Sequence, residues 1–88
     1  MAYTYIVRCA DGTLYTGCAV DLDKRLAAHN NGSGAKYTRG RGPVELLYRE
    51  VCATLSEAKR REAAIKKLNR GKKLTLINKQ QENNPEGL

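Results

Sequence analysis

Phenylalanine and tryptophan are both absent from this sequence of 88 residues, so its aromatic content consists of five tyrosines. Long apolar stretches are also missing, and no run approaches roughly 20 residues, the length that a membrane-spanning helix needs. The N-terminus lacks the basic and then apolar pattern of a secretory signal. We therefore expect a cytosolic protein rather than a membrane or secreted one.

Cysteine is scarce, and its spacing excludes two further classes of protein. The three cysteines, Cys9, Cys18 and Cys52, are odd in number and form neither a CxxC pair nor a Cys/His spacing typical of metal ligands. A disulfide framework and a zinc site are therefore not indicated. We expect all three to be small residues within strands.

Acidic residues are few, since nine Asp and Glu stand against 16 Lys and Arg and give a formal net charge of +7. A hydrophobic content of 41% in a chain this short predicts one small domain with a modest core. The positive charge fits a polyanionic partner such as nucleic acid, but it also fits a surface that only keeps the protein in solution. Charge alone leaves both interpretations open.

Two tyrosine-bearing segments near the N-terminus predict a β-hairpin. A two-residue loop would place Tyr5 and Tyr15 on opposite faces of the strand pair. A three-residue loop that ends at Gly12, with this glycine in the left-handed conformation, instead aligns Tyr15 with Val7. It also aligns Tyr5 with Gly17, which has no side chain and leaves space beside the phenol. We predict this second register, in which the two phenols share one face.

The pattern along the chain predicts three strands and three helices. The expected elements are strands at 3–9, 13–18 and 44–51, a helix from the N-cap Asp21 to His29 or Asn30, a helix from the capping box at Thr54 through Leu68, and a short helix at 74–77. We expect Gly71 to stop the second helix. The order strand, strand, helix, strand, helix, helix predicts an α+β fold with a three-stranded antiparallel sheet and helices stacked on one face. The expected domain spans residues 1–79, followed by a flexible tail at 80–88.

Arg25 and His29 stand four residues apart on the first predicted helix, so they project from one side of it. Because this helix follows directly after the strand that carries Tyr15, both side chains can reach the hairpin. The alternative is a solvated helix flank without a specific role.

Glu62 is the one acidic residue in a segment with eight cations, from Lys59 to Lys73. Helical spacing places it beside the apolar stripe, where an unpaired carboxylate is costly to bury. One interpretation is a surface ion pair with Arg61 or Lys66. The other is a carboxylate directed at a cleft, as one oxygen ligand of Mg²⁺ whose shell is completed by phosphate oxygens and water.

These residues together resemble the GIY-YIG nuclease superfamily. The resemblance rests on Thr4-Tyr5-Ile6, on Tyr15-Thr16-Gly17 ten residues later, and on Arg25, His29 and Glu62, and it covers roughly residues 3–78. The segments CADGTLYTG, GAKYTRGRGPVELLY and REAAIKKLNRGKK resemble more narrowly the small single-domain bacterial UPF0213 (YhbQ-like) family.

The resemblance implies metal-dependent hydrolysis of phosphodiester bonds in DNA, with Mg²⁺ or Mn²⁺, in repair or recombination. It assigns the site residues as follows: Tyr5 as general base or water positioner, Tyr15 as a second phenol that holds water and phosphate, Arg25 on the scissile phosphate, His29 near both, Glu62 on the metal, and Asn78 as a supporting amide. A free phenol titrates near 10, so Tyr5 needs nearby positive charge to act as a base.

The sequence departs from the pattern of the superfamily in three places. One is the late asparagine that supports the site, because Asn69 lies too near Glu62 in the sequence and Asn78 rather far from it. Thr4 replaces the glycine of the first motif. Cys18 stands where many relatives have a lysine beside the second motif, so one cation that would activate a phenol is missing.

The glycine-rich loop and the basic helices are the expected nucleic-acid contacts. The residues are Lys36, Tyr37, Arg39 and Arg41 in the loop, and Lys66, Lys67 and Arg70 in the helical part. Such a surface contacts phosphates and carries little sequence information, so we expect nonspecific or structure-directed binding. We also expect a monomer whose substrate is chosen by a partner protein. The alternative function is a noncatalytic nucleic-acid-binding module, on DNA or RNA.

The functional hypothesis depends on one geometric expectation. Both phenol hydroxyls, Tyr5 and Tyr15, should open into a common basin with the guanidinium of Arg25 and the carboxylate of Glu62.

Overall fold

The computed structural model describes residues 1–32, 38 and 40–83. The elements in chain order are β1 (Ala2–Arg8), β2 (Leu14–Ala19), α1 (Leu22–Asn30), β3 (Glu45–Cys52), α2 (Leu55–Lys66) and α3 (Arg70–Asn83). The three strands form one antiparallel sheet in the order β2-β1-β3. The predicted α+β fold and its element order are confirmed.

The hairpin between β1 and β2 has the predicted three-residue loop. Gly12 N–H donates to the carbonyl of Cys9 at 2.9 Å, and Cys9 N–H donates to the carbonyl of Thr13 at 2.8 Å. Gly12 has φ +85°, a conformation that favours glycine. As a result, Val7 pairs with Tyr15 and Tyr5 pairs with Gly17, which confirms the predicted register.

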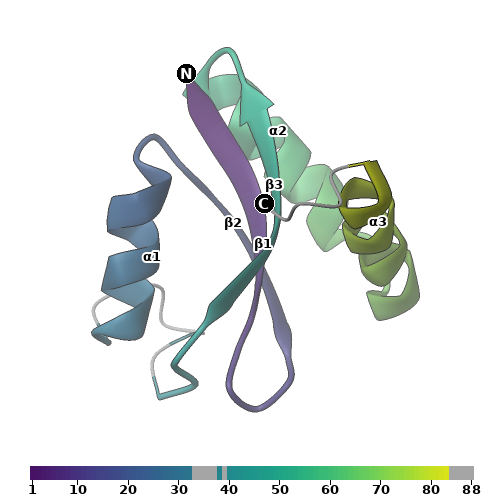
Figure 1. Cartoon of the computed structure of the whole chain (residues 1–88). Helices are drawn as coiled ribbons and strands as arrows, with labels where there is room; N and C mark the ends of the chain where they lie inside the picture. Colours follow the sequence, from purple (N-terminus) through teal and green to yellow (C-terminus); the bar gives the residue numbers. More distant parts are fainter. Residues whose placement is uncertain (33–37, 39, 84–88) are drawn as a thin grey trace.

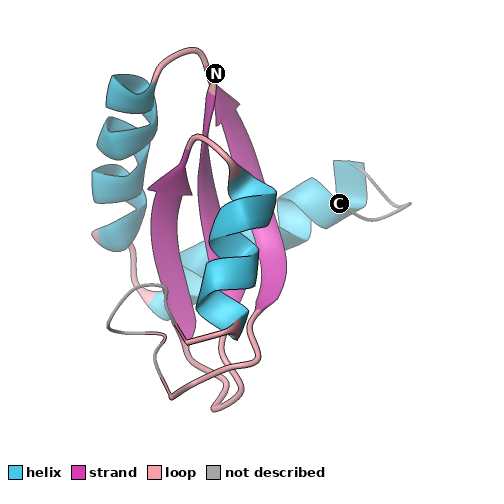
Figure 2. Ribbon diagram, turned by 90° about the vertical axis from the view of Figure 1, so that its left-hand side faces the viewer, coloured by secondary structure: helices cyan, strands magenta, loops and turns pink. Residues whose placement is uncertain are grey.

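The helices cover both faces of the sheet, so the prediction that they stack on one face is wrong. Figure 1 shows α1 on one side of the strands and α2 and α3 on the other, and Figure 2 shows α1 in front of the sheet with α3 crossing behind it. The central strand explains the arrangement, because four consecutive residues, from Thr4 to Val7, are at most 1% exposed. A strand that is apolar on both faces requires a layer of helix on each.

Two main clusters form the core, one on each face. On the α1 side, Tyr5, Val7, Ala19 and Leu22 pack together. On the other side the cluster consists of Ile6, Tyr48, Ile65 and Ile77.

Thr4, which stands where the superfamily has glycine, belongs to the side of α2. Its hydroxyl donates to the carbonyl of Ala58 at 2.8 Å and so ties β1 to α2. This departure therefore has a structural role on the face away from Tyr5.

α2 begins as predicted, whereas the end of α2 and the following helix differ from the prediction. The Thr54 hydroxyl accepts from Glu57 N–H, as in a capping box. α2 ends at Lys66, and Gly71 lies in the first turn of α3 instead of stopping α2. The reason is Asn69, whose side-chain oxygen accepts from Lys72 N–H and starts the new helix.

α3 has 14 residues and continues through residues 80–83, where a flexible tail was predicted. Gln80 explains the longer helix. Its side-chain amide donates to the carbonyl of Arg49 at 2.6 Å and accepts from Arg49 N–H at 3.1 Å, in the way that a neighbouring strand would. The helix thereby pairs with the outer edge of β3.

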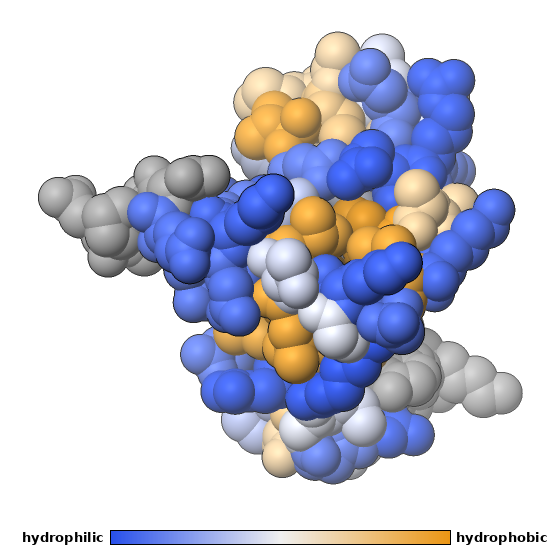
Figure 3. Space-filling model, turned by 90° about the vertical axis from the view of Figure 1, so that its right-hand side faces the viewer, coloured by the Kyte–Doolittle hydropathy of each residue, from blue (hydrophilic) through white to orange (hydrophobic). Residues whose placement is uncertain are grey.

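The face that carries α2 and α3 is largely hydrophilic, with apolar side chains showing in its middle (Figure 3). Across the described part of the chain, none of the helices combines the length and the apolar character needed to cross a membrane.

Candidate active site

An aromatic cluster of Tyr5, Tyr15 and His29 occupies the α1 side of the hairpin. The ring centroids of Tyr5 and Tyr15 lie 6.5 Å apart, and the His29 ring lies 5.8 Å from the first and 5.5 Å from the second. The hairpin register places the two tyrosines on one face, and the last turn of α1 brings His29 against both rings. The sequence prediction that these three residues meet is confirmed.

Gly17 makes this cluster possible because the Tyr5 ring lies against its backbone. A Cβ atom at this position would stand 2.6 Å from the Tyr5 hydroxyl oxygen, 2.8 Å from Tyr5 Cζ and 3.1 Å from a ring carbon of Tyr15. The space that the sequence predicted beside Tyr5 is therefore filled by the phenol itself.

His29 is held at both ring nitrogens. Its Nε2 lies 2.7 Å from the Tyr5 hydroxyl, and its Nδ1 lies 2.7 Å from the hydroxyl of Thr38. All three residues are at most 1% exposed. Burial lowers the pKa of His29 below its ordinary value, and the positive charge of Arg25 lowers it further. His29 is therefore neutral near pH 7 and has one ring nitrogen that can accept a proton.

Tyr5 does not open to solvent, so the prediction of a common basin for both phenols is wrong for this residue. Tyr5 is 1% exposed, whereas Tyr15 is half-buried. Burial raises the pKa of the Tyr5 phenol well above its usual range, the Tyr15 phenol raises it further, and Arg25 opposes the increase only in part. A free Tyr5 phenolate is thus disfavoured in the absence of a substrate or metal.

Arg25 lies one helical turn before His29 on α1 and is exposed. Its positive charge lowers the pKa values of both Tyr5 and His29. An exposed guanidinium beside a buried phenol and imidazole can bind an incoming phosphate with two parallel hydrogen bonds.

Glu62 lies on α2, four residues before Lys66, whose ammonium lies over the Tyr15 ring. Its carboxylate accepts a hydrogen bond from the Cys18 thiol and forms an ion pair with Lys66 at 2.7 Å. Burial raises the pKa of Glu62, but the hydrogen bonds from Lys66 and Cys18 outweigh it and hold the pKa below its usual range. Of the two surface partners expected from the sequence, Lys66 is found, whereas Arg61 binds Glu50 at 2.6 Å.

Lys66 compensates for the substitution at position 18, where this chain has Cys18 and many relatives in the superfamily have a lysine. The Lys66 Nζ lies 5.9 Å from the centroid of the Tyr15 ring. Hydrogen bonding to Glu62 raises the pKa of Lys66, so the ammonium is charged near pH 7. The positive charge near Tyr15 that β2 lacks at Cys18 is therefore supplied by Lys66 on α2.

The donor set around Glu62 fits a hard divalent cation only if substrate completes its shell. No group of three or more His, Cys, Asp or Glu side chains suited to a metal occurs in the part of the chain that the structure describes. Mg²⁺ is commonly bound by one or two carboxylates together with substrate phosphates and water. The single carboxylate of Glu62 suits such a shared shell, whereas the Cys18 thiol, whose pKa burial raises to about 11, is a poor ligand for Mg²⁺.

The predicted nucleic-acid contacts divide into three groups. Lys36, Tyr37 and Arg39 lie outside the described residues. Arg41 is half-buried, and its guanidinium forms an ion pair with Asp11 in the hairpin loop at 2.7 Å, which ties the glycine-rich loop to the hairpin. The remaining residues are exposed on the helical side: Lys66, Lys67 and Arg70. Among these, Arg70 donates to the carbonyl of Gly12 at 3.1 Å.

Asn78 is the predicted site residue that the structure does not bring to the cluster. It is exposed on α3, next to Ile77, which packs on the side of the sheet away from Tyr5. Within the described residues, no contact joins Asn78 to the aromatic cluster. Its proposed supporting role has no structural counterpart here.

Sequence reasoning missed Thr38 as a member of the site. Thr38 is 1% exposed although it lies in a glycine-rich loop, and it fixes His29 through Nδ1. A single polar residue in a loop without hydrophobic periodicity carries no signal that would distinguish it from its neighbours.

The chain is similar in sequence to several known proteins. A family model described as the GIY-YIG catalytic domain matches residues 1–75. A UPF0213 protein of Staphylococcus saprophyticus is 59% identical over 75 residues, which cover 85% of this chain and 92% of that protein. A UPF0213 protein of Clostridium perfringens is 58% identical over 77 residues, covering 88% of this chain and 83% of that protein.

Two solution NMR structures have the same fold. A UPF0213 protein from Bacillus halodurans aligns with a TM-score of 0.57 and 46% identity, covering 89% of this chain and 84% of that one. A protein from E. faecalis aligns with a TM-score of 0.59 and 42% identity, covering 88% and 82%. The motif tyrosines on one hairpin face, the surrounding fold and these matches lead to one conclusion: the chain belongs to the GIY-YIG family and, within it, to the bacterial UPF0213 proteins.

Proposed function

We propose that this protein is a metal-dependent endonuclease that hydrolyses phosphodiester bonds in DNA, in repair or recombination. The observation that carries the proposal is the cluster of Tyr5, Tyr15 and His29, with the charges of Arg25 and Glu62 at its border. A purely structural role does not require two phenols and an imidazole to meet beside an exposed arginine. Membership of a family of nucleases supports the same chemistry.

Substrate binding is the role proposed for the cations at the border of the cluster. Arg25 binds two oxygens of the scissile phosphate and stabilises the negative charge that builds up in the transition state. Lys66, whose ammonium lies over the Tyr15 ring, adds a second positive charge for the phosphate. Tyr15 is half-buried and is the phenol that contacts the phosphate or the attacking water directly.

The proposed base is the hydrogen-bonded pair of Tyr5 and His29 rather than a free phenolate. The Tyr5 oxygen takes a proton from water while its own proton passes to His29 Nε2, 2.7 Å away. The lowered pKa of His29 keeps the imidazole neutral and ready to accept this proton. Because Tyr5 is buried, the proposal includes a displacement of the Tyr15 ring when the phosphate binds.

Glu62 would hold the divalent cation together with the substrate phosphate. When bound, the cation would supply Lewis-acid stabilisation of the phosphate and the leaving group. Lys66 would have to move from Glu62 toward the phosphate, exchanging one anionic partner for another.

The test is a nicking assay on supercoiled and branched DNA with Mg²⁺ or Mn²⁺. The variant Glu62→Ala is compared with Glu82→Ala, which removes the same charge from an exposed position on α3. We expect wild type and Glu82→Ala to nick alike and Glu62→Ala to lose at least about 100-fold in rate, since metal stabilisation amounts to several kcal/mol. Equal nicking by all three proteins would refute the proposed role of Glu62.

A noncatalytic nucleic-acid-binding module is the second candidate, and two observations favour it. Tyr5 is sealed from solvent, and Glu62 already has Lys66 as a partner. Salt-dependent binding of DNA or RNA by wild type, without nicking under any metal condition, would establish this alternative.

A further inference from the structure

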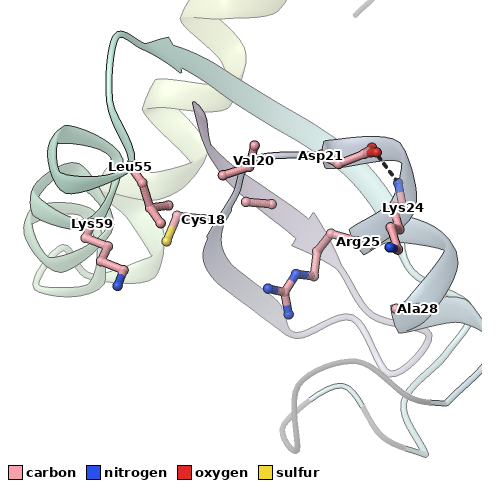
Figure 4. Close-up of a pocket in the computed structure, with 9 residues that line it drawn as sticks. Cys18, Val20, Asp21, Lys24, Arg25, Ala28, Leu55 and Lys59 are labelled. Carbon is pink, nitrogen blue, oxygen red and sulfur yellow. Dashed lines mark hydrogen bonds between the residues drawn. The ribbon is translucent and has the colours of Figure 1, made fainter. Parts of the chain in front are cut away.

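A pocket of about 520 Å³ lies between α1, the end of β2 and the start of α2, directly beside the proposed active site. The residues that line it are Cys18, Ala19, Val20, Asp21, Lys24, Arg25, Ala28, Leu55 and Lys59. Figure 4 shows Arg25 and Lys59 on opposite sides of this pocket, with Cys18 between them. The volume falls within the range of small-molecule sites, which is about 300–1,000 Å³.

The floor of the pocket is apolar, and two of its apolar side chains remain exposed. Val20 is 61% exposed and Leu55 is 38% exposed, whereas Ala28 is half-buried. Neighbouring exposed apolar groups around a hollow indicate a surface that is covered by a ligand.

The rim of the pocket is cationic. Lys24, Arg25 and Lys59 stand against a single acid, Asp21. The Asp21 side chain is already engaged, because it accepts from Lys24 N–H at 3.0 Å as the N-cap of α1. An apolar floor under a positive rim suits a ligand with a flat, weakly polar body and an anionic edge, as in a nucleotide.

Arg25 links this pocket to the active site. It lines the pocket, and its charge also influences Tyr5 and His29. Cys18 makes a second link, since its thiol lies in the pocket wall and donates to Glu62. A strand whose scissile phosphate sits at Arg25 would therefore present its next nucleotide to the pocket.

We propose that this pocket binds one unpaired nucleotide adjacent to the scissile phosphate, and that it thereby directs the protein to junctions between duplex and single strand. The proposal rests on the proposed function, because it takes Arg25 as the phosphate contact. A paired nucleotide enters only at the cost of unstacking its base and breaking its bonds to the opposite strand. An unpaired nucleotide at a flap or a gap enters without the cost of unpairing.

The test is a binding experiment without divalent metal, so that its result does not depend on cleavage. The probe is a DNA duplex with a single-stranded flap that carries 2-aminopurine at the first unpaired position. The control probe has the same base paired in a full duplex, and a second flap is made of RNA. We expect the fluorescence of 2-aminopurine to rise on binding of the DNA and RNA flaps and not on binding of the duplex. The DNA flap should bind about tenfold more tightly than the duplex, which is within the range of affinity gained by accommodating one base.

Three variants decide the assignment. Ala28→Leu, which fills the pocket, and Leu55→Ser, which removes apolar floor, should both abolish the preference for the flap and leave duplex binding unchanged. Leu74→Ser is the matched control, because Leu74 is 37% exposed on α3 and lies outside the pocket. A preference for the flap that survives both pocket variants, or equal binding of flap and duplex by wild type, would overturn the proposal.

The two proposals can fail separately. If the wild type prefers the flap but never nicks, and Ala28→Leu loses this preference, the pocket proposal is supported and the nuclease function is rejected. If the wild type nicks DNA but shows no preference for the flap, the nuclease function is supported and the pocket proposal is rejected. Absence of all nucleic-acid binding would overturn both.

Discussion

Replacing Gly17 by alanine tests the packing on which the candidate site depends. The new Cβ would lie 2.6 Å from the Tyr5 hydroxyl oxygen and 2.8 Å from Tyr5 Cζ, distances that real Cβ atoms do not show. Tyr5 is 1% exposed and cannot turn away without leaving His29. Overpacking of this kind costs about 1–3 kcal/mol, and the lost hydrogen bond adds about 0.5–1.5 kcal/mol. We expect Gly17→Ala to lower the free energy of unfolding by about 1.5–4.5 kcal/mol.

Urea denaturation at neutral pH measures this loss, with Gly71→Ala as the control. A Cβ at Gly71 would meet only the Asn69 side chain at 3.4 Å, an ordinary contact, so this variant should be about 0.5–1 kcal/mol more stable than wild type. In a Tyr5→Phe background the cost of Gly17→Ala should be smaller, because the closest atom is gone. An unfolding free energy of Gly17→Ala within about 0.5 kcal/mol of wild type would refute this placement of the Tyr5 ring.

Three further predictions follow from His29, Gln80 and Glu62. Burial lowers the pKa of His29 in the folded state, so the unfolded state binds the proton first as the pH falls below about 6.5. The free energy of unfolding should therefore drop below this pH by at most about 1.4 kcal/mol per pH unit. Urea titrations from pH 7.5 to 5 measure the slope, and an equal slope in His29→Gln would contradict it. Gln80→Ala should lose about 1 kcal/mol in the same assay, because Arg49 loses both of its edge hydrogen bonds, and no loss would show that these bonds are not formed in solution. Mg²⁺ alone should give no saturable calorimetric binding at about 1 mM, since one carboxylate needs substrate phosphate to complete the shell, and tight binding without nucleic acid would contradict the assignment of Glu62.

The hairpin was predictable from sequence because its register follows from a few local rules. Loop length and the conformation of Gly12 decide which residues face each other, and both can be inferred from the residues of the turn. The meeting of Tyr5, Tyr15 and His29 follows from this register and from the short connection to α1.

The burial of Tyr5 could not be predicted, because it depends on contacts between distant segments. Thr38 and the backbone of Gly17 enclose the phenol and His29, and no local pattern shows that a loop residue packs there. The distribution of helices over both faces was missed for a related reason. The order of the elements alone is compatible with helices on one face, whereas the run of buried residues in β1 requires a cover on both sides.

The second helical boundary shows how a local rule can mislead. Gly71 suggests a helix stop by residue type alone, yet Asn69 two residues earlier caps a new helix and places this glycine in its first turn. The long α3 then depends on Gln80, whose pairing with β3 is a tertiary contact that sequence periodicity does not carry.

The most direct test of the proposed reaction centre is the single-turnover nicking rate of Tyr5→Phe, measured with DNA affinity in parallel. This substitution removes one hydroxyl and leaves the ring, the cations and Glu62 in place. We expect the nicking rate to fall by about 100- to 10,000-fold, the range for a general base, and DNA affinity to stay within about twofold of wild type. Nicking by Tyr5→Phe at the rate of wild type would contradict the claim that Tyr5 and His29 form the base.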